Sequence, residues 1–441
     1  MRKLERKYDR EMVVIGVHSP KFITERETES VRQAILRLNV GHPVVNDSEF
    51  TVWRSYAVRA WPTLMFIDPE GRVIGKHEGE FETETFDRLI GTMVAELDAE
   101  GRLDRRPLTI SGDRAIADGP LRFPGKLLAD VDRGLLAISD TGHNRVILAH
   151  LDGTVRQVIG SGQPGLADGP ASEAQLDMPQ GLALHGNTLY VADTENHALR
   201  VVDLQTGNVA TFAGTGVQLM GPRVGGALLQ TRLSSPWDLT IANGVLYVAM
   251  AGTHQIWATS LGSGDIQPHT GDGREALVDG PRLAAAMNQP SGITTDGTAL
   301  YVADSEASAI RHIDPAADGQ ITTIVGEGLF EFGDRDGIGP AQVRLQHPIG
   351  VAWHQGVLYI ADTYNHRIKR LDPSTGECRA FAGQGLPGDT DGPAATARFS
   401  EPSGLAVAGD SLYVADTNNH VIRAVSLGGE PTVSTLPLRG L

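Results

Sequence analysis

A unit of 54–58 residues, repeated six times, is the feature that most constrains what this 441-residue chain can fold into. Each copy begins with a proline, and the steps between successive prolines are 55, 57, 54, 58 and 54 residues (Pro124, Pro179, Pro236, Pro290, Pro348 and Pro402). A second marker, Leu-Tyr-Val-Ala-Asp or a variant of it, follows each proline (Leu135–Asp140, Leu189–Asp193, Leu246–Met250, Leu300–Asp304, Leu358–Asp362 and Leu412–Asp416). A steady period of this length indicates a propeller, a solenoid or an array.

Each copy contains four short segments that read as strands. In the fifth copy they are 350–353, 357–362, 366–372 and 377–382, separated by glycine-containing or polar turns. Four antiparallel strands per repeat are typical of a propeller blade. A β-solenoid is the alternative, but its strands are parallel and tight hairpin turns argue against it. We predict a mainly β protein with a six-bladed propeller (blades near 123–175, 176–232, 233–286, 287–344, 345–398 and 399–441).

Composition divides the chain near residue 106, because 45 of its 52 glycines lie beyond that point. The net charge of −16 divides as well: residues 1–106 hold 17 basic and 19 acidic residues, net −2, which leaves −14 for the rest. We therefore predict a first domain over 1–100, a linker with a possible ring-closing strand over 101–111, and the propeller over 112–441. In this scheme the segment 107–112 lies close to the last strand, 431–436.

Charge and cysteine content exclude several classes of function. An acidic chain is a poor ligand for nucleic acid, whose affinity comes from Lys and Arg, and no apolar run is long enough for a transmembrane helix. The charged start has no apolar segment of a secretory signal behind it, so we expect a cytoplasmic protein without a membrane partner. The single cysteine, Cys378, excludes an internal disulfide and is expected to be buried in a strand.

The sequence around the second marker carries a family resemblance. The run Leu-Tyr-Val-Ala-Asp-Thr-x-Asn-His-x-Ile-Arg resembles the NHL repeat, a family of six-bladed β-propellers, and is nearly intact at 194–197, 363–366 and 417–420. The first copy reverses the order to His143-Asn144, the third has Met250 in place of Asp, and the fourth ends in Ser308 without Asn or His. The resemblance implies a fold and leaves the activity open.

The recurring Asp, Asn and His have two interpretations. In the structural one, Asp accepts amide hydrogens of a turn, Asn takes a left-handed conformation and His packs beside the next strand. In the functional one, the side chains form a ring that binds a divalent metal, since some NHL propellers are metal-dependent lyases with His ligands near the axis (here His197, His254, His366, His420, Asp193, Asp362 and Asp416). We favour the structural interpretation, because the motif recurs as a structural device does, and we expect no cofactor.

Two loops with the pattern Gly-Asp-x-Asp-Gly, at 333–337 and 388–392, suggest calcium. Neither continues to a Glu at the twelfth position, so an Asx turn followed by a glycine turn is the favoured interpretation. Motifs of serine hydrolases, zinc proteases, P-loop proteins and dinucleotide-binding folds do not occur in the required context. The sequence therefore offers no recognised catalytic residues.

Residues 1–100 follow a different pattern, with expected strands at 12–18, 43–46, 64–68 and 72–77 and helices at 24–38 and 86–97. This order resembles the second part of a thioredoxin-like domain of the TlpA type. Trp61-Pro62-Thr63 resembles the cis-proline segment of that family, whose active members carry a Cys-x-x-Cys that is absent here. The domain is then either continued upstream of Met1 or a degenerate docking module, and Trp53 and Trp61 are either packed in its core or partly exposed.

Three functions follow from these patterns. The first is a non-catalytic scaffold that binds a protein or peptide through the propeller, with the thioredoxin-like module as a second contact surface. The second is a thiol–disulfide oxidoreductase whose Cys-x-x-Cys lies upstream, and the third is a metal-dependent propeller lyase or hydrolase. We favour the scaffold, because the residues given carry neither a cysteine pair nor a catalytic constellation.

Overall fold

The computed structural model describes residues 1–79, 83–106, 119–221 and 223–441. It divides into two compact units, Met1–Ala117 and Asp118–Leu441, each of which is described by itself. The expected ring-closing strand at 107–112 lies outside the described residues. Within the described residues, no helix combines the length and the apolar character that crossing a membrane requires.

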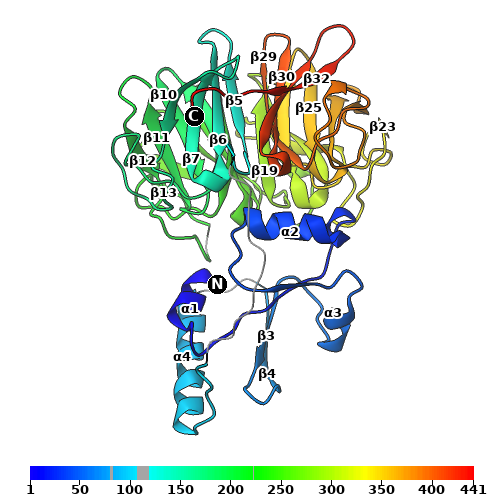
Figure 1. Cartoon of the computed structure of the whole chain (residues 1–441). Coiled ribbons are helices and arrows are strands. Elements are labelled where there is room, and N and C mark those ends of the chain that lie inside the picture. Colours follow the sequence, from blue (N-terminus) through cyan, green and yellow to red (C-terminus); the bar gives the residue numbers. More distant parts are fainter. Residues whose placement is uncertain (80–82, 107–118, 222) are drawn as a thin grey trace. The chain divides into compact units, whose positions relative to one another are not determined.

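The second unit is a six-bladed β-propeller (Figure 1). Each described blade has four strands that run antiparallel from the axis outwards, which excludes the parallel solenoid. The blades are β5 (Leu127–Asp130), β6 (Leu135–Asp140), β7 (Arg145–His150), β8 (Val155–Ile159); β9 (Pro179–His185), β10 (Thr188–Asp193), β11 (Ala198–Asp203), β12 (Val209–Ala213); β14 (Pro236–Ala242), β15 (Val245–Met250), β16 (Gln255–Ser260), β17 (Asp265–Thr270); β19 (Pro290–Thr295), β20 (Leu300–Asp304), β21 (Ala309–Ile313), β22 (Gln320–Val325); β24 (Gly350–His354), β25 (Val357–Asp362), β26 (Arg367–Asp372), β27 (Glu377–Ala382); and β29 (Pro402–Ala408), β30 (Ser411–Asp416), β31 (Val421–Ser426), β32 (Thr432–Leu436). The four strands expected in the fifth copy are confirmed to within a residue.

The first strand of every blade lies at the axis. Each of these strands contacts the first strand of the next blade, so that β5, β9, β14, β19, β24 and β29 form a closed circuit. Glycine near the start of the strand permits the close approach. A Cβ added to Gly350 would lie 1.8 Å from the carbonyl oxygen of Ser403 in the next blade, so no larger residue fits there.

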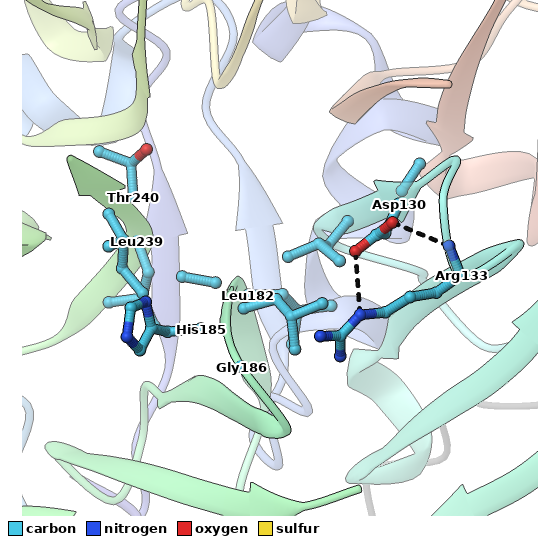
Figure 2. Close-up of a pocket in the computed structure, with 12 residues that line it drawn as sticks. Asp130, Arg133, Leu182, His185, Gly186, Leu239 and Thr240 are labelled. Carbon is cyan, nitrogen blue, oxygen red and sulfur yellow. Dashed lines mark hydrogen bonds and ion pairs between the residues drawn. The ribbon is translucent and has the colours of Figure 1, made fainter. Parts of the chain in front are cut away.

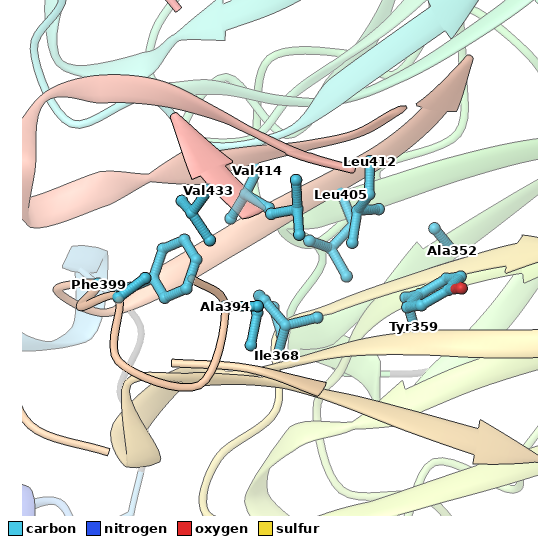
Figure 3. Close-up of a cluster of buried hydrophobic side chains, with 13 residues drawn as sticks. Ala352, Tyr359, Ile368, Ala394, Phe399, Leu405, Leu412, Val414 and Val433 are labelled. Carbon is cyan, nitrogen blue, oxygen red and sulfur yellow. The ribbon is translucent and has the colours of Figure 1, made fainter. Parts of the chain in front are cut away.

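Apolar cores between neighbouring blades hold the ring together. The core between the fifth and sixth blades contains Phe399 and Ile368 together with Leu405, Leu412 and Val414 (Figure 3). The other blade junctions have equivalent cores, including the junction of blade six with blade one, where Tyr413 packs with Leu136 and Ile138. Because both faces of each sheet are covered, the second strands are continuously buried, as their apolar sequence predicts. Cys378 is fully buried in β27, as expected.

Short extra strands protect the outer edges of the blades. Blades three to six each gain a two-residue strand from the loop that precedes them: β13 (Gly226–Ala227), β18 (Gly280–Pro281), β23 (Gly337–Ile338) and β28 (Gly392–Pro393). The first blade receives the chain's last residues, where Arg439 bridges to Thr154 (Figure 1). Paired edges leave fewer unsatisfied backbone groups for association with other chains.

The first unit contains two separate two-stranded sheets. β1 (Gly16–His18) and β2 (Val44–Asn46) are parallel, whereas β3 (Thr63–Ile67) and β4 (Val73–Glu78) form an antiparallel hairpin. The helices are α1 (Arg2–Lys7), α2 (Thr28–Arg37), α3 (Thr51–Ser55) and α4 (Thr83–Ala99). Leu4 and Tyr8 of the first helical segment pack against Phe86 and Ile90 of α4 in a small core. The expected strands and helices occur in the expected order, but the first strand is shorter than the predicted 12–18, the helix predicted at 24–38 begins at Thr28, and α3 was not predicted. The thioredoxin-like fold stays a prediction.

The proline segment of this unit precedes β3. The Trp61–Pro62 peptide bond is cis, and Trp61 Nε1 donates a hydrogen bond to the Ser19 carbonyl oxygen at 2.9 Å. The rings of Trp53 and Trp61 lie 4.5 Å apart between centroids. Trp61 nevertheless remains 49% exposed, so of the two expectations for this side chain the structure shows partial exposure.

Candidate functional site

The aspartate that ends the second strand in five of the six blades is a buried hydrogen-bond acceptor. In the sixth blade, Asp416 accepts the backbone N–H of Ser400 at 2.7 Å and the Asn419 side-chain amide at 2.8 Å. Asp193 and Asp362 have the same two kinds of donor. Burial raises the pKa of Asp193 and of Asp416 to about 6, and that of Asp362 to about 7.

A buried cation links this aspartate to a second one. In the sixth blade the Arg423 guanidinium, which is fully buried, contacts Asp416 at 2.8 Å and the loop residue Asp391 at 2.6 Å. Blades two and four repeat the arrangement (Arg200 with Asp193 and Asp168; Arg311 with Asp304 and Asp279). The role of this cation was not predicted from the sequence, although the cation follows the aspartate by seven residues in each of these blades.

The two Gly-Asp-x-Asp-Gly loops supply carboxylates to these cations. Asp391 contacts Arg423 and also accepts the backbone N–H of Thr435 at 3.0 Å. In the fifth blade, Lys369 takes the place of arginine, and its ammonium contacts Asp334 at 2.6 Å and Asp336 at 2.7 Å. Protein cations therefore occupy the positions that a calcium ion would need at these oxygens.

The motif histidines join neighbouring blades. His366 Nδ1 accepts the backbone N–H of Glu401 at 3.1 Å, and His420 Nδ1 accepts that of Phe123 at 3.0 Å, which closes the ring. His197 and His254 do the same with Ser235 and Gln289. In blades one and four, the side chains of Asn144 and Ser308 supply the acceptor instead.

One detail of the expected turn is wrong. The left-handed residue is His366, with φ of 52°, and not the preceding Asn365. Asn365 lies in a short 3-10 turn and donates its amide to Asp362 at 2.7 Å. The left-handed conformation of this last motif residue directs its side chain toward the next blade, where it accepts a hydrogen bond. In the first blade, where the order is reversed, this residue is Asn144, with φ of 53°.

The hydroxyl that follows the motif aspartate makes a second hydrogen bond across five of the six junctions. Thr363 Oγ1 donates to the Pro402 carbonyl oxygen at 2.8 Å, and Thr417 Oγ1 donates to that of Pro124 at 2.9 Å. Equivalent bonds start from Thr141, Thr194 and Ser305. The third blade, which has Ala251 at this position, lacks the hydroxyl. The repeated proline and the motif threonine are thus partners across a blade junction.

The candidate metal ligands do not converge. The four histidines lie at four different blade junctions, and the described part of the chain holds no group of three or more His, Cys, Asp or Glu placed to bind one metal ion. Burial lowers the pKa of His254 to about 4 and also lowers that of His366 and of His420. These histidines are therefore neutral acceptors near pH 7.

A buried ion pair crosses the propeller axis. Lys126 of the first blade is 3% exposed, and its ammonium contacts Asp238 of the third blade at 3.0 Å. Its other two contacts, both at 2.6 Å, are the carbonyl oxygens of Ser291 and Ile349 in blades four and five. All three donor positions of the ammonium are thus used. Nothing in the sequence patterns singled out this pair, because each of its members occurs in only one copy.

Beyond this pair the axis opens into a pocket of about 400 Å³. Its walls are the first strands of blades one, two and three, at Leu128–Asp130, Leu182–Gly186 and Leu239–Ile241. Figure 2 shows Asp130 and Arg133 on one side of the pocket and His185, Leu239 and Thr240 on the other. Asp130 accepts the backbone N–H of Arg133 at 3.1 Å, and its other oxygen lies 3.4 Å from the Arg133 side chain.

Comparison with known proteins agrees with this fold. The NHL repeat family matches residues 176–202 and 399–424, which lie in the second and sixth blades. The chain therefore forms a six-bladed β-propeller with NHL repeats matched in its second and sixth blades.

Two curated relatives match almost the whole chain. Protein SUPPRESSOR OF QUENCHING 1, chloroplastic, of Arabidopsis thaliana is 40% identical over 99% of this chain and 44% of its own length. Human NHL repeat-containing protein 2 is 36% identical over 97% of this chain and 63% of its own length. The chain therefore spans only part of each relative. The cytoplasmic location expected for this chain stays a prediction, since the plant relative is named as chloroplastic.

Among solved structures, a protein of unknown function from Bacteroides thetaiotaomicron matches with a TM-score of 0.52. It covers 73% of this chain and 72% of its own, at 15% identity. A likeness at this level of identity concerns the fold alone.

Proposed function

We propose that this chain is a non-catalytic scaffold, which binds a protein or peptide partner through its NHL propeller. The observation that carries the proposal is the structural role of the recurring polar motif. Its Asp, Asn, Thr and His side chains all make hydrogen bonds within or between blades. A rigid ring with loops on both faces and a pocket at its axis is suited to recognition, which needs preorganised surfaces.

The charge distribution supports a binding role of the same kind. The chain has a formal net charge of −16, and a buried cation of the repeat such as Arg423 is matched by two aspartates. A protein with this balance associates fastest with a partner that presents basic groups. Nucleic acid is not such a partner.

The experiment is reconstitution of a complex from purified components. A tagged full-length chain is recovered from its own cells, and each co-purifying protein is produced separately and titrated against the chain by calorimetry. We expect a stoichiometric complex whose affinity falls as salt is raised. His366→Asn and His420→Asn serve as matched controls, because each preserves the acceptor at a blade junction and removes the imidazole.

These controls separate a scaffold from an enzyme. A scaffold keeps its affinity in both variants, since asparagine already fills this role at Asn144. If no purified candidate forms a stoichiometric complex, or if either variant removes a chemical activity that the wild-type chain displays, the scaffold proposal is wrong.

A further inference from the structure

The axial pocket is walled by strand edges. β5, β9 and β14 are the terminal strands of their sheets, so one edge of each has no partner among the strands of the described residues. Side chains of β9 alternate between the two neighbouring cores: Leu182 packs with the core toward blade one, and Ala183 with the core toward blade three. With both faces covered, the backbone N–H and C=O groups of the inner edge face the axis.

The pocket is closed at one end. Lys126 spans the axis to contacts in blades three, four and five, and its partner Asp238 directly precedes the lining residue Leu239. The lining residues lie beyond this pair toward the hairpins that follow the first strands. A chain therefore enters from the hairpin side and stops at the ion pair, so that a segment cannot thread through the ring.

We propose that this pocket binds the terminus of an extended polypeptide, which adds as a short strand to the inner edge of β9 or of its neighbours. The proposal rests on the scaffold function above and names its ligand. Strand addition fits because free backbone groups line the wall, and a terminus fits because the pocket is blind. From Leu182 to Gly186 the wall has room for about four residues at about 3.3 Å each.

The volume agrees with this length of peptide. A pocket of about 400 Å³ is within the range of ligand sites, about 300–1,000 Å³, but it leaves no space for a folded loop with two strands. Main-chain recognition also predicts weak sequence preference, because the groups that bind are the same in every peptide.

Peptide libraries test the proposal on the full-length chain. Three libraries carry the same randomised heptapeptide at a free C-terminus, at a free N-terminus, or between two folded carrier domains. We expect enrichment from one or both terminal libraries and none from the internal library. A selected peptide, fluorescently labelled at its other end, is then titrated by anisotropy, and N-methylation of its terminal residues is expected to abolish binding.

Two variants locate the site. Thr240→Tyr places a ring in the pocket, whereas Thr322→Tyr makes the same change on the exposed outer strand β22. We expect the first to weaken binding by about tenfold or more and the second to leave it unchanged. If Thr240→Tyr lowers the melting temperature, His185→Trp at the exposed pocket mouth replaces it. A photoreactive terminal residue on the peptide should then cross-link to the pocket walls.

The outcomes distinguish this proposal from the scaffold function. A peptide that binds equally well to wild type, Thr240→Tyr and His185→Trp shows that the propeller binds elsewhere, which overturns the site and retains the scaffold. Enrichment from the internal library alone overturns the terminus. Enrichment from none of the libraries overturns peptide binding at this pocket, while a reconstituted protein complex would still support the scaffold.

Discussion

At the scale of the residue, the side chains at the last position of the motif share one role, which is to accept a hydrogen bond from the next blade. His366 Nδ1, Asn144 Oδ1 and Ser308 Oγ all accept one backbone N–H of the next blade. These positions share a left-handed backbone and a side chain that carries a hydrogen-bond acceptor close to the main chain. Histidine and asparagine therefore make the same hydrogen bond at this position, although one side chain is an imidazole and the other an amide.

This equivalence predicts the outcome of substitution at His366. His366→Ala leaves the buried Glu401 N–H without its acceptor, so it should lower the free energy of unfolding by about 1–2 kcal/mol. His366→Asn should cost less, because asparagine supplies an acceptor and tolerates the left-handed conformation. Urea unfolding of both variants checks this. Equal losses for alanine and asparagine would contradict the role as acceptor.

A second prediction concerns the axial ion pair. Lys126→Met leaves Asp238 buried without its cation, which should lower the free energy of unfolding by about 3–5 kcal/mol. Burial opposes the charged form in both partners, since it lowers the pKa of Lys126 and raises that of Asp238. The double variant Lys126→Met, Asp238→Asn should therefore be more stable than Lys126→Met alone. Denaturant unfolding of the three proteins measures the difference, and an equally unstable double variant would show that lost packing, not charge, dominates.

At the scale of the element, blades two, four and six are each tied to the loop before them by a cation between two aspartates. The sequence presented all three residues, since Asp304, Arg311 and Asp279 belong to recurring patterns. Their contact was not predictable from spacing, because Asp279 lies 32 residues from Arg311 and reaches it only when the loop wraps the outer strand. Strands, turns and blade number follow from local pattern, whereas these contacts follow from how the loops fold back.

Substitution of the buried cation should lower the free energy of unfolding less when the new side chain keeps the positive charge. Arg311→Met leaves the fully buried Asp304 uncompensated and should lower the free energy of unfolding by about 3–5 kcal/mol. Arg311→Lys should be milder, because Lys369 fills the equivalent place in the fifth blade with two aspartates. Chemical denaturation of both variants tests this. A lysine variant as unstable as the methionine variant would mean that the bidentate guanidinium, rather than its charge, is required.

Metal removal tests the loops themselves. Asp391 is engaged by Arg423 and by the Thr435 N–H, so we expect the melting temperature to be the same in excess calcium and in excess EDTA. Asp391→Asn should lower the melting temperature in both conditions, since it weakens a charge-assisted contact to a buried cation. Scanning fluorimetry provides the measurement. A calcium-dependent rise that disappears in Asp391→Asn would revive the calcium interpretation.

At the scale of the whole molecule, stability is shared among blade junctions that are chemically similar, and the ring closes with the same bonds that join its interior blades. Phe123 and His420 are 297 residues apart and yet make the same contact as Glu401 and His366. Six repeats predict a closed ring, but the hydrogen bond from Phe123 to His420 that closes it was not predicted, and the expected closing strand at 107–112 lies outside the described residues. The axial pair Lys126–Asp238 was not predictable, because an interaction made once across the axis leaves no periodic signal.

The shared junctions also make the molecule's stability depend on pH. Burial, followed by the nearby Arg223, lowers the pKa of His254 from 6.5 to about 4, while Glu306 opposes this shift. Between these values the unfolded chain binds a proton that the native chain does not, so His254 should destabilise the fold as pH falls from 6.5 to 4. Asp193 and Asp416, whose pKa values burial raises to about 6, act in the opposite direction over much of this range.

A comparison of two proteins isolates the histidine from these carboxyl groups. His254→Asn keeps an acceptor for the Gln289 N–H and removes the titrating ring, while every buried aspartate is unchanged. The difference in unfolding free energy between wild type and this variant should be constant above pH 6.5 and should shift in favour of the variant as pH falls toward 4. Urea unfolding across this range measures it. A difference that does not change with pH would mean that His254 titrates alike in the native and unfolded chains, and that this blade junction tolerates a charged imidazole.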